Sequence, residues 1–130
     1  MNPSTAPAVS ELNADGLDAL HDRLLALLRQ TLELPQAALD QAYQGVVEQI
    51  ETDFRQENLL METFQCADAH LHREQHARML AGLHQAGSAL AGGDPAPAYR
   101  ALAVLADWLP FHIATQDCHL SRLLRARDRQ

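Results

Sequence analysis

The sequence predicts an all-α protein that folds as an up-down-up-down antiparallel four-helix bundle. Beyond residue 13, apolar residues recur at i, i+3 and i+4 spacing, and no alternating strand pattern is present. Short links separate four such stretches. With 130 residues, 47% hydrophobic and 21% charged, the chain is expected to form one globular domain. A helical dimer that shares this core between two chains is the alternative architecture.

The first half of the chain predicts a short tail and two helices. Residues 1–13 are small, polar and Pro-containing, so we expect a flexible tail before a bundle domain over residues 14–127. Asp15 is a candidate N-cap of the first helix, and Pro35 suits the first position of a second helix that ends near Cys66. The predicted core residues of these helices are Leu17, Leu20, Leu24, Leu25, Leu28, Leu32, Leu39, Tyr43, Val46, Val47, Ile50, Phe54, Met61 and Phe64.

The second half predicts two more helices. Asp68 is a candidate cap of the third, which stops at Gly92 and Gly93. The fourth is expected to start near Pro97 and to continue through a kink at Pro110. The predicted core residues here are Leu71, Met79, Leu80, Leu83, Leu90, Leu102, Leu105, Trp108, Leu109, Ile113, Leu120, Leu123 and Leu124.

Charge and cysteine content exclude several classes of protein. A net charge of -7 argues against a nucleic-acid or anionic-membrane partner held by bulk charge. No apolar run approaches the roughly 20 residues of a membrane span, and the N-terminus lacks the features of a secretory signal. Two cysteines do not make a disulfide scaffold, so we expect a cytoplasmic protein. Cys66 and Cys118 are expected near one end of the bundle, as ordinary thiols rather than as a redox switch.

Metal-ligating side chains occur on the apolar stripe of every predicted helix. They are His21 on the first helix, Asp53 and Glu57 on the second, His72 and His76 on the third, and His112 and Asp117 on the fourth. Antiparallel order brings all seven to one level of the bundle, where unpaired polar groups would be costly. Four histidines and three carboxylates exceed the needs of one tetrahedral zinc ion and suit two six-coordinate ions bridged by carboxylates.

Each of these residues taken alone has an ordinary explanation. A single histidine such as His21 is more often a core or boundary residue, and Asp53 with Glu57 could form a solvated face. The joint pattern on four helices favours metal binding over these coincidences. Three histidines fall on other faces or at other levels and are left out of the site: His70, His84 and His119.

The ordered motifs resemble the hemerythrin family, especially the bacterial hemerythrins. The matching segments are LDALHDRLLALL, DFRQENLLM, HREQH and WLPFHIATQD. They follow the family pattern of a first His, then His-Phe-x-x-Glu, His-x3-His and His-x4-Asp, with Glu57 and His72 fifteen residues apart. The resemblance covers about residues 14–125. It departs from the family at Asp53, where the family has a histidine.

The resemblance implies a centre of two iron ions with an oxo or hydroxo bridge. His72, His76 and His112 would bind one iron, His21 with Asp53 would bind the other, and Glu57 with Asp117 would bridge them. The anionic oxygen of Asp53 is expected to favour the ferric state and to speed autoxidation of an oxygen adduct, or to weaken the second position.

The resemblance also implies reversible binding of dioxygen or a related small ligand, for storage, delivery or sensing. Candidates for an apolar ligand pocket are Leu25, Leu28, Phe54, Met61, Trp108 and Ile113. A sensor or a redox cycle would need a separate signalling or reductase partner. The alternatives are a di-iron peroxidase, oxidase or nitric-oxide-handling enzyme, an iron- or redox-responsive interaction module, and a structural bundle that holds zinc.

Overall fold

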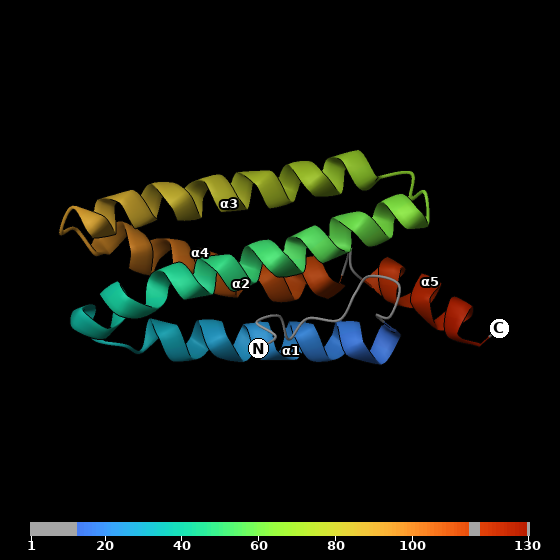
Figure 1. Cartoon of the computed structure of the whole chain (residues 1–130), viewed down its shortest axis with the longest axis horizontal. Helices are drawn as coiled ribbons and strands as arrows, with labels where there is room; N and C mark the ends of the chain where they lie inside the picture. The colour runs from blue at the N-terminus through green and yellow to red at the C-terminus, as the bar shows by residue number, and fades with distance from the viewer. Residues whose placement is uncertain (1–12, 115–117, 130) are drawn as a thin grey trace, which may run out of the picture.

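The computed structural model describes residues 13–114 and 118–129, apart from the side chains of residues 118 and 119. Within these residues the chain forms helices and no strand, so the all-α prediction is confirmed. Figure 1 shows the helices in chain order: α1 (Ala14–Leu32), α2 (Gln36–Thr63), α3 (Ala69–Ala91), α4 (Ala96–His112) and α5 (Cys118–Asp128).

The first four helices pack around a common core. Helix α1 contacts α2 and α4, and α3 contacts the same two helices. Successive helices from α1 to α4 reverse direction (Figure 1), because the links between α1, α2, α3 and α4 are only a few residues long. Helix α5 packs against α1.

The helix ends differ from the predicted positions by a few residues. Asn13, and not Asp15, caps α1, since its side chain accepts a hydrogen bond from the backbone N–H of Gly16 at 2.7 Å. Pro35 lies just before α2 rather than inside its first turn, and α2 ends at Thr63, before Cys66. The predicted tail, residues 1–12, lies outside the described residues.

The prediction of one continuous fourth helix was wrong, because the structure has two helices there, α4 and α5. Pro110 lies inside the last turn of α4 and has no N–H to donate to the preceding turn. Helix α4 ends two residues later at His112, and Ile113 and Ala114 continue in a wider π-helical turn. The loss of regular hydrogen bonding therefore falls next to His112.

The apolar core is divided into two parts along the bundle axis. The larger part lies among α1 to α4 and includes Leu28, Ile50 and Leu105. The smaller part lies at the α5 end and includes Leu17 and Leu124. On both α1 and α2, residues of the two parts are separated by buried polar side chains. The bundle thus contains a polar layer between two apolar ones.

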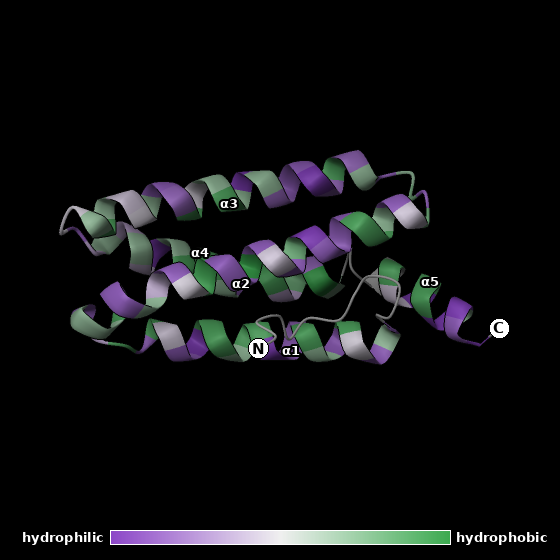
Figure 2. Ribbon diagram, viewed as in Figure 1, coloured by the Kyte–Doolittle hydropathy of each residue, from purple (hydrophilic) through white to green (hydrophobic). Residues whose placement is uncertain are grey.

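Each helix of the bundle contains both apolar and polar residues (Figure 2). Figure 2 shows hydrophobic and hydrophilic residues on every helix, with hydrophilic residues dominating the end of α5. One predicted core residue was wrong: Leu71 is 51% exposed, because it lies on the face of α3 that points away from the core between α2 and α4. Among the described helices, none is both long and apolar enough to cross a membrane.

Candidate metal centre

The polar layer contains six of the seven predicted ligands, and each of the six is almost completely buried. Their exposed fractions are between 1% and 4%, and they come from all four long helices: His21 from α1, Asp53 and Glu57 from α2, His72 and His76 from α3, and His112 from α4. The seventh predicted ligand, Asp117, lies outside the described residues. Buried imidazoles and carboxylates in such numbers need charged or hydrogen-bonding partners.

Glu57 occupies the middle of the layer, and its two carboxylate oxygens contact different histidines. Oε2 pairs with Nε2 of His21 at 2.5 Å. Oε1 lies 3.1 Å from Nε2 of His76 and 3.7 Å from Nε2 of His72. Burial raises the pKa of Glu57, but these histidines outweigh it and hold the pKa well below its ordinary value. Glu57 is therefore a carboxylate shared between α1 on one side and α3 on the other.

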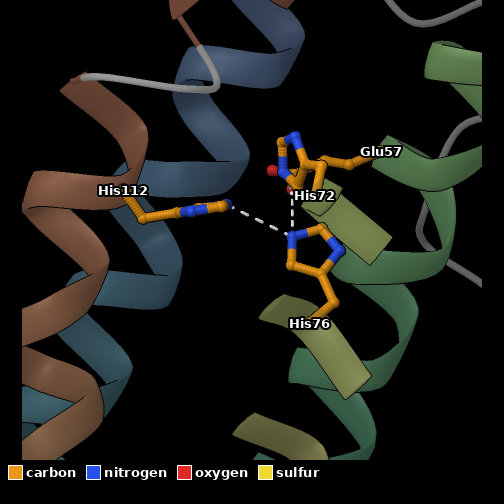
Figure 3. A group of neighbouring side chains, drawn as sticks. All are labelled: Glu57, His72, His76 and His112. Atoms are coloured by element: carbon orange, nitrogen blue, oxygen red, sulfur yellow. Dashed lines mark hydrogen bonds and ion pairs between the residues drawn. The ribbon is translucent and has the colours of Figure 1, made fainter. Parts of the chain in front are cut away.

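Three histidines converge on the Oε1 side of Glu57. Figure 3 shows His112 reaching from α4 towards His76 and His72 on α3. The Nε2 atoms of His76 and His112 are 3.3 Å apart. One ligand atom from each of Glu57, His72, His76 and His112 lies within 4.8 Å of all the others. A cation at this point would meet three imidazoles and a carboxylate, a donor set typical of zinc and iron sites.

Two aromatic rings hold this cluster in place. Phe54 stacks on His76, with ring centroids 3.9 Å apart and an angle of 4° between the planes. Trp108 stacks on His112 at 4.2 Å and meets the edge of Phe54 at 6.5 Å. Of the predicted pocket residues, Leu28, Phe54 and Met61 are buried, whereas Leu25, Trp108 and Ile113 are partly exposed.

Asp53 lies in the same layer, outside the four-residue cluster around His76. Its Oδ1 accepts a hydrogen bond from Nε2 of Gln49 at 3.0 Å, and its Oδ2 has no hydrogen-bond partner among the described residues. Burial raises the pKa of Asp53 to about 6, in opposition to the hydrogen bond from Gln49. A buried carboxylate oxygen without a proton donor is a suitable ligand for a cation.

The ligand atoms of the cluster suit a metal ion better than they suit hydrogen bonds to one another. Burial lowers the pKa of His76, so its imidazole tends to be neutral and one ring nitrogen carries a lone pair. Its Nε2 faces another imidazole nitrogen and a carboxylate oxygen, Oε1 of Glu57, that accepts no hydrogen bond from the described residues. Such a convergence of lone pairs is stabilised by a positive ion.

The histidines left out of the predicted site lie elsewhere. His84 is exposed and pairs with Glu51 at 3.0 Å, two turns along α3 from His76. His70 is exposed and lies 3.5 Å from Glu74. The side chain of His119 lies outside the described residues, as does that of Cys118, so the expected proximity of Cys118 to Cys66 stays a prediction. Cys66 is a partly buried free thiol.

Comparison with known proteins gives one informative match. The chain is 27% identical over 110 residues to a protein named Bacteriohemerythrin from Ralstonia nicotianae. The alignment spans 85% of this chain and 80% of that protein. The similarity supports a hemerythrin-like family. No protein-family model and no solved structure matches the chain.

Sequence reasoning missed two amides that contact predicted ligands. Asn58 accepts a hydrogen bond from Nδ1 of His76 at 2.9 Å, and Gln49 donates to Asp53. The i, i+4 spacing of Gln49 and Asp53 could have indicated the second contact. Asn58 and His76 come from different helices, so helical periodicity alone could not pair them.

Proposed function

We propose that this chain is a non-haem di-iron protein that binds dioxygen. Similarity to a bacteriohemerythrin and the buried cluster of histidines with Glu57 support a di-iron oxygen-binding role. In this proposal His72, His76 and His112 would hold one iron, His21 and Asp53 would hold the other, and Glu57 and Asp117 would be ligands of both. Two iron ions so held would supply the redox chemistry that reversible dioxygen binding requires.

The position of Glu57 carries the proposal. Its two oxygens face imidazoles from opposite sides, with His21 on one and His72 and His76 on the other. A carboxylate that served a single ion would not need imidazoles at both oxygens. Two adjacent ions of positive charge give both oxygens and all three imidazoles a partner at once.

The side chains around the cluster suit a small-ligand site, because such a site needs an apolar lining and fixed ligand orientations. Phe54 and Trp108 stack on His76 and His112, and Leu28 and Met61 are buried in the two parts of the core. An apolar lining of this kind excludes water and slows loss of charged products from the site. The ring stacking also keeps the imidazoles in fixed orientations.

The same proposal extends to the topology, the cellular location and the partners of the protein. The bundle is proposed to have an up-down-up-down topology over residues 14–127, with α5 as a separate helix after α4. We propose a cytoplasmic location, which the use of only two cysteines supports. The proposed partners are dioxygen or a related small ligand and a separate reductase or signalling protein, with no role for nucleic acid or membrane.

Asp53 favours a second candidate function, a di-iron peroxidase, oxidase or nitric-oxide-handling enzyme. An anionic oxygen ligand stabilises ferric iron more than an imidazole does, and this favours turnover over reversible binding. Repeated cycles of oxygen and argon distinguish the two: a spectrum that returns unchanged supports binding, and bleaching that accelerates with added reductant and peroxide supports an enzyme.

The test of the proposal is iron loading of matched histidine variants. The purified protein is reconstituted with Fe²⁺ without oxygen, and the iron per chain is measured for wild type, His76→Leu and His84→Leu. We expect about two iron ions in wild type and in His84→Leu, because His84 lies outside the layer, and fewer in His76→Leu. One iron per chain with no gain on reconstitution would exclude the dinuclear site, and equal loading of both variants would exclude this ligand set.

A further inference from the structure

Two amide side chains of α2 contact predicted ligands from outside the polar layer. Nδ1 of His76 donates a hydrogen bond to Oδ1 of Asn58 at 2.9 Å, and Nε2 of Gln49 donates to Oδ1 of Asp53 at 3.0 Å. Asn58 directly follows Glu57 in the sequence, and Gln49 lies one helical turn before Asp53. Both amides therefore occupy the helix that supplies the central carboxylate.

The contact with Asn58 determines which nitrogen of His76 faces the site. With the proton on Nδ1 and donated to Asn58, a neutral imidazole presents its lone pair at Nε2. That nitrogen is the one that lies 3.1 Å from Glu57 and 3.3 Å from His112. Stacking on Phe54 fixes the plane of the same ring. Asn58 and Phe54 together leave His76 one orientation, with its lone pair directed into the cluster.

The contact with Gln49 separates the two oxygens of Asp53. Oδ1 is occupied by the amide N–H, whereas Oδ2 is buried and has no hydrogen-bond partner among the described residues. A carboxylate held by one oxygen cannot rotate freely, so the other oxygen is kept available inside the layer. This hydrogen bond opposes the movement of Asp53 out of the layer.

We propose that Asn58 and Gln49 are positioning residues for two different metal positions. Asn58 acts on the position of His72, His76 and His112 through the tautomer of His76. Gln49 acts on the position of His21 and Asp53 through the orientation of the Asp53 carboxylate. The inference rests on the proposed di-iron function, and it predicts that the two positions can be weakened separately.

The experiment compares Asn58→Leu with Gln49→Leu, so that each variant is the control for the other. Both substitutions remove the amide from α2 and keep a side chain of helix-forming type. Reconstituted protein is titrated with a chelator of known Fe²⁺ affinity, and anomalous diffraction at the iron edge gives the occupancy of each position. Asn58→Leu is expected to weaken the His76 position by about 10- to 100-fold, and Gln49→Leu the Asp53 position, while the other position keeps wild-type affinity.

Two further measurements separate positioning from a general loss of structure. Asn58→Asp retains an oxygen acceptor for Nδ1 of His76 and is expected to restore most of the affinity lost in Asn58→Leu. In the zinc-loaded protein, an ¹⁵N–¹H spectrum is expected to show a slowly exchanging Nδ1–H of His76 in wild type and Asn58→Asp, and not in Asn58→Leu. Asn58→Ala replaces the leucine variant if leucine disturbs helix packing.

Wild-type affinity at both positions in both leucine variants would overturn this inference and leave the proposed function intact. Equal weakening of both positions by either variant would also overturn it, since the effect would then come from the fold. A wild-type protein that takes up no iron would overturn the proposed function together with this inference.

Discussion

The shared position of Glu57 predicts that its charge is needed for both metal ions. Glu57→Gln keeps the size of the side chain but replaces one anionic oxygen with an amide N–H₂, which cannot be a metal ligand. The stabilisation that metal gives to the fold should therefore be mostly lost. Glu51→Gln is the matched control, because Glu51 lies on the same helix and also pairs with a histidine, at 3.0 Å, but on the surface.

The magnitude follows from mass action. A ligand at one hundred times its dissociation constant stabilises the folded state by about 2.7 kcal/mol for each site, so two sites give about 5 kcal/mol. For a domain of this size 1 kcal/mol corresponds to about 4 °C in Tm. Wild type and Glu51→Gln should thus gain about 20 °C on iron loading, and Glu57→Gln about 5 °C or less.

The assay is thermal unfolding followed by circular dichroism, without oxygen, with and without Fe²⁺. The difference between the two curves of each variant removes any effect of the substitution on the metal-free fold. A Glu57→Gln protein that gains as much as wild type would refute the bridging role. A Glu51→Gln protein that loses the gain would show that surface charge, and not the buried layer, controls metal binding.

Three predictions concern the fold itself. Tyr43 is 2% exposed and donates to the carbonyl of Leu83 at 2.8 Å, and burial raises the pKa of Tyr43 from 10.0 to about 12. The unfolded chain therefore ionises first, so in urea titrations wild type should lose about 1.4 kcal/mol more than Tyr43→Phe between pH 9 and 11. Gly82 lies inside α3, and a Cβ added there would have no neighbouring atom within 4 Å. Gly82→Ala should therefore add about 0.5–1 kcal/mol to the free energy of unfolding. Leu124→Ala should cost about 2–5 kcal/mol in the same measurement, because this α5 residue is fully buried in the smaller part of the core.

Each of these three has a simple contradicting result. Parallel pH curves for wild type and Tyr43→Phe would mean that Tyr43 ionises as it does in water. A loss of stability in Gly82→Ala would mean that α3 needs a glycine at this position. A change under about 1 kcal/mol in Leu124→Ala would mean that α5 contributes little to the folded core.

Much of the fold follows from periodicity, which is a local property of the sequence. The stripes that contain Leu24, Ile50 and Leu105 place these residues in the core, where the structure has them. The same stripes carry His21 and His112 inwards, so the polar layer could be anticipated from spacing. The prediction that Leu71 is a core residue was wrong, because a single apolar residue between polar neighbours does not define which side of α3 is covered.

The features that sequence analysis missed involve two or more structures that the spacing of residues permits equally well. Asn13 and Asp15 are both good N-caps, and the choice was decided by where the first turn closes. Pro110 could bend a helix or end it, and the wider turn at Ile113 decided for the end of α4. The contact of Asn58 with His76 spans two helices and depends on their relative rotation, which is a property of packing.

Anomalous diffraction from crystals of the iron-loaded protein at the iron edge tests the central claim most directly. The account predicts two scatterers in the polar layer, one on the side of Glu57 that faces His72, His76 and His112 and one on the side that faces His21. A fully folded protein with no scatterer in the layer, or with a single one that leaves His21 and Asp53 uncoordinated, would contradict it.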